Sequence, residues 1–124
     1  PPLDLPTGDP HDATADLGPY GLVTVRFSTD PNPALPSGTV ILRFMPMDSR
    51  QRPVALDSLS FEYGREGSDR PAGSCEARLM SDGSGMFMGG IVFGEVGNWW
   101  VRVRLTKGGE QAEARFRLYV EPAQ

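Results

Sequence analysis

Apolar and polar residues alternate along most of the chain from Tyr20 onward. The alternation is clearest in WWVRVRL (99–105) and QAEARFRLYV (111–120), where every second side chain is apolar. Successive side chains of a strand point to opposite faces, so this period of two predicts strands with one buried and one solvated face. The predicted strands are residues 22–27, 39–47, 54–63, 74–80, 86–93, 99–105 and 111–120.

The segments between these strands favour turns. The chain holds 15 glycines and 12 prolines among its 124 residues, and the loop at 28–38 alone carries three of the prolines. Such punctuation, with no convincing amphipathic helix, predicts an all-β protein. About seven alternating strands in roughly a hundred residues predict an immunoglobulin-like antiparallel β-sandwich, with a small barrel as the alternative.

The first 18 residues differ from the rest because they are rich in Pro, Asp and Gly and poor in large apolar side chains. We expect a leader or linker at 1–18 and the sandwich domain at 19–124. The only histidine, His11, lies in this leader beside Asp9 and Asp12, where we expect it to be solvated. The chain opens without Met, which we interpret as a fragment or mature form that lacks an upstream secretion signal or membrane anchor.

Composition excludes several classes of site. The net charge of −4 argues against general nucleic-acid binding, which needs a basic face. The single cysteine, Cys75, excludes an intrachain disulfide and the multi-cysteine metal motifs, and its parity with Ala77 and Leu79 predicts a place in the core. A Ser-His-Asp triad would depend on the leader histidine, so we expect no enzyme.

An arginine-rich face is predicted next to a tryptophan. The outward side chains of the last two predicted strands are Trp100, Arg102, Arg104, Arg115 and Arg117. Antiparallel pairing across the KGGE turn would place them on one sheet face. One hypothesis is a docking face for an acidic partner or anionic surface, with Trp100 as its anchor. The other is a solvated face balanced by carboxylates of neighbouring loops, with Trp100 stacked on an arginine.

Two M-x-M pairs raise the question of a soft metal. Met45 and Met47 share one face of their predicted strand, as do Met86 and Met88. Thioether sulfur suits Cu(I), so neighbouring strands could build a copper site from the four sulfurs. The alternative is that these flexible side chains only cover a sheet.

The order of motifs resembles a known family. A Pro-rich first loop, an apolar strand and a turn with R-P-V precede G-x-aromatic and aromatic-x-x-x-G-x-W-x-V-x-V. In this chain the last two motifs are carried by Gly85, Phe87, Phe93, Gly97, Trp99, Val101 and Val103. Over most of residues 20–121 the chain resembles the YtkA-like family and the related FixH-like extracytoplasmic domains.

The resemblance implies a β-sandwich outside the cytoplasm, often anchored or fused to other modules, and some members are associated with copper handling or respiratory-oxidase assembly. Metal-linked members tend to carry methionines in the loop after the third strand, whereas here that loop, 64–73, has none.

The resulting prediction is a non-enzymatic accessory or binding module in the periplasm, in the cell envelope or secreted. It would recognise a protein partner through the face around Trp100, without a cofactor and without nucleic acid. Contact with a membrane would come only through a missing N-terminal segment, and the oligomeric state is open. The alternatives are a copper-binding accessory protein that uses the four methionines and a structural immunoglobulin-like spacer.

Overall fold

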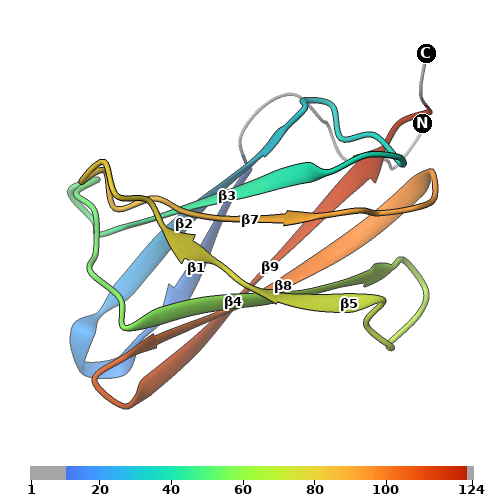
Figure 1. Cartoon of the computed structure of the whole chain (residues 1–124). Coiled ribbons are helices and arrows are strands. Elements are labelled where there is room, and N and C mark those ends of the chain that lie inside the picture. The colour runs from blue at the N-terminus through green and yellow to red at the C-terminus, as the bar shows by residue number, and fades with distance from the viewer. Residues whose placement is uncertain (1–10, 123–124) are drawn as a thin grey trace.

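Two antiparallel sheets face each other across one core in the computed structural model, which describes residues 11–122 (Figure 1). The first sheet, called sheet A, has the order β1 (His11–Asp16), β2 (Leu22–Asp30), β3 (Val40–Met47), β7 (Phe87–Ile91) and β6 (Arg78–Leu79). Sheet B has the order β5 (Gly73–Glu76), β4 (Ser58–Arg65), β8 (Gly97–Lys107) and β9 (Glu110–Val120). The predicted all-β immunoglobulin-like sandwich is confirmed.

The inward side chains follow the predicted parity. Trp99, Val101, Val103 and Leu105 of β8 are all buried, as the alternation predicts. Aromatic rings join the sheets: the centroid of Phe27 lies 4.9 Å from that of Phe116 in the opposite sheet. The only helical element among residues 11–122 is a 3-10 turn at Gly18–Tyr20, and no helix there is long and apolar enough to cross a membrane.

Part of the predicted leader belongs to the sandwich. Residues 11–16 form β1, which pairs with β2 in a register that sets Ala13 opposite Val25 and Ala15 opposite Val23. Small apolar residues alternate here with Asp and Thr, and Ala15 and the following Leu17 are buried. The interpretation of residues 11–18 as a linker is therefore corrected, because alternating apolar residues in this Asp-rich stretch pair it with β2 and bury one side of it in the core. Residues 1–10 lie outside the described part of the chain.

The predicted strand 74–80 is divided between the sheets. β5 pairs with β4 in sheet B, whereas β6 pairs with β7 in sheet A. The backbone N–H of Ala77 still donates to the carbonyl of Leu59 in β4, and the chain crosses to sheet A directly after it. The crossing reverses the expected facing of Leu79, which is 57% exposed, and leaves Cys75 only partly buried. With this division and β1, the described residues form nine strands.

Candidate functional site: the Trp100–arginine face

The predicted arginine face exists on the outer side of sheet B. Pairing of β8 with β9 sets Trp100 opposite Arg117 and Arg102 opposite Arg115. In the same register Arg104 lies opposite Glu113. All five residues named from the sequence therefore share one face, and we call it the Trp100–arginine face.

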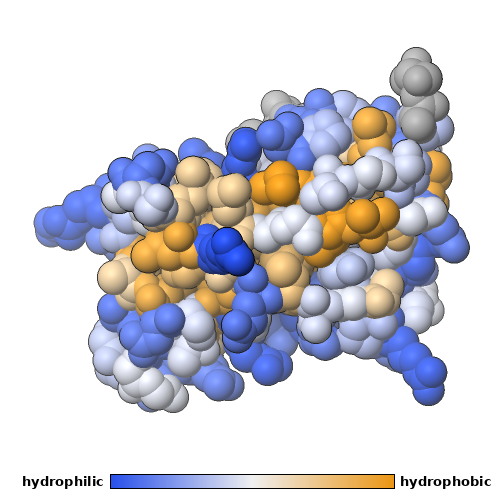
Figure 2. All heavy atoms as spheres, viewed as in Figure 1, coloured by the Kyte–Doolittle hydropathy of each residue, from blue (hydrophilic) through white to orange (hydrophobic). Residues whose placement is uncertain are grey.

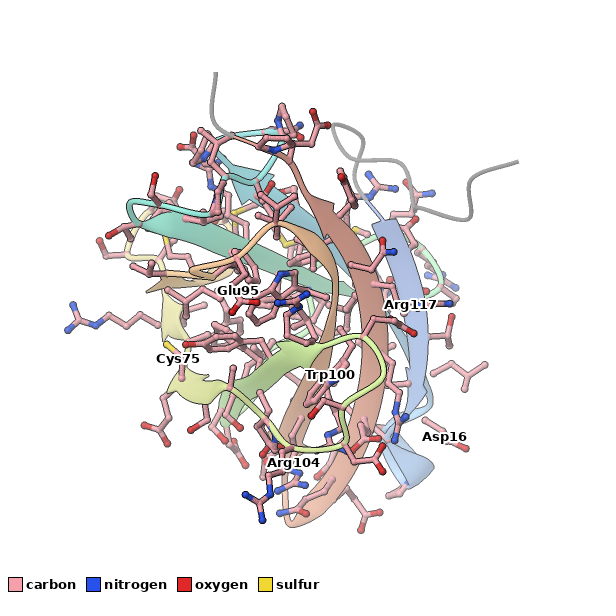
Figure 3. All side chains as sticks on the ribbon, turned by 90° about the vertical axis from the view of Figure 1, so that its right-hand side faces the viewer. Asp16, Cys75, Glu95, Trp100, Arg104 and Arg117 are labelled. Atoms are coloured by element: carbon pink, nitrogen blue, oxygen red, sulfur yellow. The ribbon has the colours of Figure 1, made fainter. Side chains whose placement is uncertain are left out.

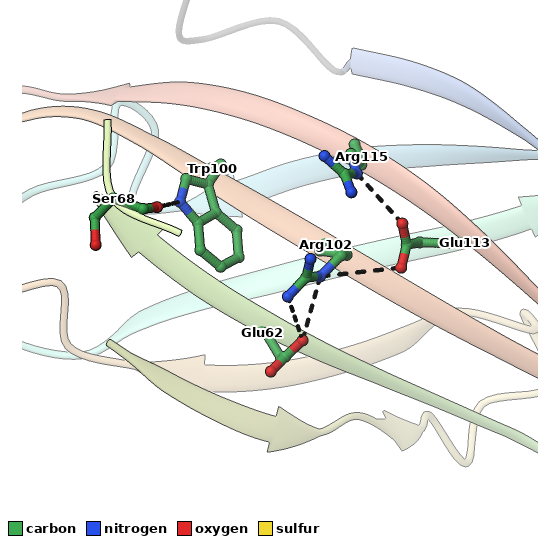
Figure 4. A network of polar contacts seen from close by, with 6 residues as sticks. All are labelled: Glu62, Ser68, Trp100, Arg102, Glu113 and Arg115. Atoms are coloured by element: carbon green, nitrogen blue, oxygen red, sulfur yellow. Dashed lines mark hydrogen bonds and ion pairs between the residues drawn. The ribbon is translucent and has the colours of Figure 1, made fainter. Parts of the chain in front are cut away.

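Carboxylates pair with most of these arginines, and Figure 4 shows two of them, Glu62 of β4 and Glu113 of β9. The Arg102 guanidinium donates to Oε1 of Glu62 in β4 at 2.9 and 3.2 Å, and its Nε lies 3.9 Å from Oε1 of Glu113. Arg115 donates to the other oxygen of Glu113 at 3.3 Å. Guanidinium groups on adjacent strands repel each other, and these carboxylates hold them in a ladder of alternating charge.

A fourth pair extends the ladder to the loop after β4. Arg117 donates to both carboxylate oxygens of Glu66 at 2.9 and 3.2 Å. The sequence predicted carboxylates of neighbouring loops as one way to balance the arginines, and Glu66 is such a carboxylate, but neither Glu62 nor Glu66 could be matched with its arginine. Glu62 carried a signal, because it alternates outward between Phe61 and Tyr63, but the adjacency of β4 and β8 was needed to match it with Arg102.

Trp100 is held in place by the same loop. Its Nε1–H donates to the carbonyl of Ser68 at 2.9 Å, and the Arg102 guanidinium lies 5.2 Å from its ring centroid. Gly64 gives the indole its room, because a Cβ there would lie 2.7 Å from Cε2 of Trp100 and 2.9 Å from the carbonyl oxygen of Arg70. The predicted stacking on arginine is present, and the indole is positioned before any partner arrives.

A hollow of about 360 Å³ opens between the loop and the two strands, lined by residues 66–69, 100–102 and 115–117. Figure 3 shows Trp100 beside the loop that follows β4, with Arg104 and Arg117 on the same side of the sheet. The wall of the hollow combines an indole with three guanidinium groups. Such a wall can receive an apolar group and a carboxylate side by side.

Arg104 differs from the other three arginines. It is exposed, and although it lies opposite Glu113 in the register, it forms no ion pair with any residue from 11 to 122. The face thus ends in one cation whose charge is left for solvent or a ligand.

The four methionines lie on or beside the outer face of sheet A. β3 and β7 are neighbours, with Arg43 opposite Met88. Met45 and Met47 therefore lie on the same face as Met88, and all three side chains are partly buried. Met86 directly precedes β7, and its carbonyl accepts the N–H of Met80 at 2.8 Å. The two strands that carry the pairs are therefore neighbours, although the residue opposite Met88 is Arg43, and copper binding itself stays a prediction.

Cys75 does not strengthen such a site. Burial raises the pKa of its thiol above the ordinary value of 9.0, and the charge of Glu76 adds to the shift. Metal binding to a thiol requires the loss of its proton, and the raised pKa makes that loss less favourable. Within residues 11–122, no three His, Cys, Asp or Glu side chains are grouped closely enough to hold a metal ion.

Comparison of the chain with protein-family models, with curated proteins and with solved structures gives no match. The resemblance to YtkA-like and FixH-like domains therefore stays a prediction that rests on the motifs of the sequence.

Proposed function

We propose that this chain is a non-enzymatic binding module that recognises a protein partner through the Trp100–arginine face. The observation that carries the proposal is the hollow beside Trp100, where an indole and guanidinium groups are already fixed by the loop after β4. Trp and Arg are the side chains that contribute most often to binding energy at protein interfaces. A wall that is ordered in advance also lowers the entropic cost of binding.

The charges indicate an acidic partner surface. The face has four arginines, and three of them pair with Glu62, Glu66 and Glu113, so that Arg104 lies outside the ladder. The Arg115 side chain is 71% exposed and can donate hydrogen bonds to a second carboxylate without breaking its bond to Glu113. We also propose that the chain lies outside the cytoplasm, and only the family resemblance supports this part of the proposal.

The test compares two matched faces. Wild type, Trp100→Ala and the double variant Arg104→Gln/Arg115→Gln are immobilised and exposed to an extract of the organism that carries the chain. The control is Arg26→Gln/Arg43→Gln on sheet A, which removes the same charge from the other face. We expect one bound protein to be lost with both sheet B variants and retained by the control.

The isolated partner then gives dissociation constants for all variants, with circular dichroism to verify the fold. A partner that tolerates both sheet B variants contradicts the proposal. If neither wild type nor any variant captures a protein, the result favours the structural spacer.

A second candidate function, Cu(I) binding, is favoured by one observation: β3 and β7 bring two methionine pairs together on one side of sheet A. Here the thioethers of Met45, Met47, Met86 and Met88 would hold the ion. Titration with Cu(I) under reducing conditions, against a chromogenic chelator, tests this function. Tight binding in wild type and Met80→Leu that vanishes in Met86→Leu/Met88→Leu would support it, and failure to compete with the chelator would exclude it.

A further inference from the structure

Strand β7 has an open edge next to a hollow. On one side it pairs with β3 over its whole length, but on the other side β6 covers only Phe87 and Met88. Gly89, Gly90 and Ile91 have no strand beside them on that side within residues 11–122. A hollow of about 410 Å³ lies there, at the point where the chain crosses between the sheets.

Backbone groups at this edge point outward. The carbonyl of Met86 accepts the N–H of Met80, so Met86 directs its polar groups to the side of β6. In an antiparallel ladder every second residue uses the same side, which assigns this side to Met88 and Gly90 as well. The N–H and C=O of Gly90 therefore face open space, ready to pair with an extended chain.

Gly90 adds no side chain to the outer face of sheet A, and this bare backbone position is a narrow gap bordered by Thr39 and Ile41. It is exposed and lies opposite Ile41, and a Cβ there would come within 3.0 Å of Cγ2 of Thr39 and 3.3 Å of Cδ1 of Ile41. A large side chain on an added strand could lie across the bare glycine, as aromatic residues do beside glycines in sheets. Figure 2 shows apolar groups gathered on this side of the molecule between hydrophilic rims.

The direction of an added strand determines which end lies near Arg78. Every strand of sheet A is antiparallel to its neighbours, so an added strand beside β7 would run in the direction of β6 and end where β6 begins. Arg78 lines the hollow at this point, is exposed, and has no carboxylate partner among residues 11–122. Glu76 lines the same hollow and disfavours an acidic side chain.

We propose that β7 binds the free C-terminal segment of a partner protein as an added antiparallel strand. Its last residue lies opposite Gly90 and places a large apolar side chain over the gap toward Ile41. Its terminal carboxylate accepts hydrogen bonds from the N–H of Gly90 and from the Arg78 guanidinium. This site is separate from the Trp100–arginine face and does not depend on the function proposed for that face.

The test uses a fluorescein-labelled peptide, Gly-Ser-Thr-Val-Thr-Phe, with a free terminal carboxylate. Two matched probes carry a terminal amide or end in Ala. By fluorescence anisotropy we expect the free acid to bind, and amidation to raise the dissociation constant at least about tenfold because it removes a charged hydrogen bond. We expect the Ala peptide to bind more weakly, because it leaves the gap over Gly90 unfilled.

Two variants locate the site. Arg78→Gln should abolish the difference between acid and amide, and Gly90→Val should weaken both because its side chain fills the gap. Arg50→Gln, which changes the same charge on an exposed turn, and Trp100→Ala should leave binding unchanged. Amide NMR shifts should move at Gly90, Val92 and Arg78, and thermal unfolding verifies that each variant folds.

Three results would overturn the proposal. One is no binding of either free-acid peptide at millimolar concentration. Another is binding that is insensitive to amidation and to Gly90→Val. The third is a concentration-dependent dimer, seen by sedimentation in wild type and lost in Gly90→Val, which would make a second copy of this chain the occupant of the edge.

Discussion

The outer faces of the two sheets arise from the same alternation but differ in chemistry. On sheet B, guanidinium and carboxylate groups of β4, β8 and β9 interlock, and Arg102 links Glu62 to Glu113. On sheet A, the outward side chains of β3 and β7 include methionines and Ile41. Two separate ion pairs lie on the same face, Arg26 with Asp12 and Arg43 with Asp30. The charged groups of sheet B form one linked network, whereas those of sheet A form separate pairs beside apolar side chains.

This difference indicates how each face can act. A network of charge-assisted hydrogen bonds fixes its members in one arrangement, so the hollow beside Trp100 has a defined shape before binding. Thioethers are flexible and polarizable, and they adapt to whatever covers them. We therefore expect sheet B to select a partner by geometry and charge, and sheet A to accept apolar or soft groups.

The largest loss of stability is expected from a substitution in the hydrophobic core between the two sheets. Trp99 is 2% exposed, lies 5.0 Å from Phe93 in an edge arrangement, and donates from Nε1 to the carbonyl of Glu95 at 3.0 Å. Trp99→Ala should lower the free energy of unfolding by about 3–5 kcal/mol, as for other buried aromatic residues. Urea denaturation followed by circular dichroism measures the change.

Its neighbour on the outer face serves as the matched control. Trp100→Ala loses one hydrogen bond and the packing on Gly64, which should cost about 1–2 kcal/mol. Equal losses for the two tryptophans would contradict the distinction between core and face.

Substitution of one glycine on each face allows a direct comparison of the two faces. A methyl group at Gly64 would press on the Trp100 indole and on the backbone of the loop, so Gly64→Ala should destabilise the fold by about 1–3 kcal/mol. At Gly90 the nearest atoms are Cγ2 of Thr39 at 3.0 Å and Cδ1 of Ile41 at 3.3 Å, with no backbone or ring atom among them, so Gly90→Ala should cost less than about 1 kcal/mol. Thermal unfolding distinguishes them, and tryptophan fluorescence should change only in Gly64→Ala.

The sequence predicted which side chains share a face of a strand better than it predicted which strands are neighbours. Alternation in 99–105 and 111–120 was strong enough to assign the core side of β8 and β9, because both strands are long and half-buried. The hairpin turn at 107–110 also specified that they pair, so the common face of Trp100 and the four arginines was predictable.

What could not be predicted depends on adjacency across the fold. Nothing local indicates that Glu62 lies beside Arg102, since 40 residues separate them and β4 could have paired elsewhere. The crossing at Ala77 was hidden for the same reason, because alternation from Cys75 to Leu79 continues while the strand changes sheets. The alternation in 11–17 was local and predictable, but two of its three apolar residues, Ala13 and Ala15, are small.

A smaller effect is expected from the ion-pair ladder. Glu62→Gln leaves the Arg102 guanidinium, whose side chain is 29% exposed, without its closest carboxylate. We expect a loss of about 1 kcal/mol that shrinks at high salt, because partly exposed pairs are screened. Asp30→Asn removes the more exposed Arg43 pair of sheet A and should cost less than about 0.5 kcal/mol. Urea denaturation at low and high salt measures both, and a larger loss for Asp30→Asn would reverse the comparison.

The smallest effect concerns the turn after β3, at the end of the methionine face. Asp48 accepts hydrogen bonds from the backbone N–H groups of Arg52 at 3.0 Å and Arg50 at 2.8 Å. The bond from Arg52 contributes most to lowering the pKa of Asp48 below its ordinary value of 3.8. The ionised carboxylate therefore stabilises the fold above pH 3.8, and this contribution is lost as the pH falls through the lowered value.

Asp48→Asn should accordingly be less stable than wild type at neutral pH. The two proteins should approach each other as the pH falls below 3.8 and converge below the lowered pKa of Asp48. Urea midpoints across this range measure the difference. Asp69→Asn makes the same change of charge in the loop of the Trp100–arginine face and serves as the control for net charge. A gap between Asp48→Asn and wild type that persists unchanged in acid would show that the amide disturbs the turn by its shape, and that the carboxylate charge does not stabilise this end of sheet A.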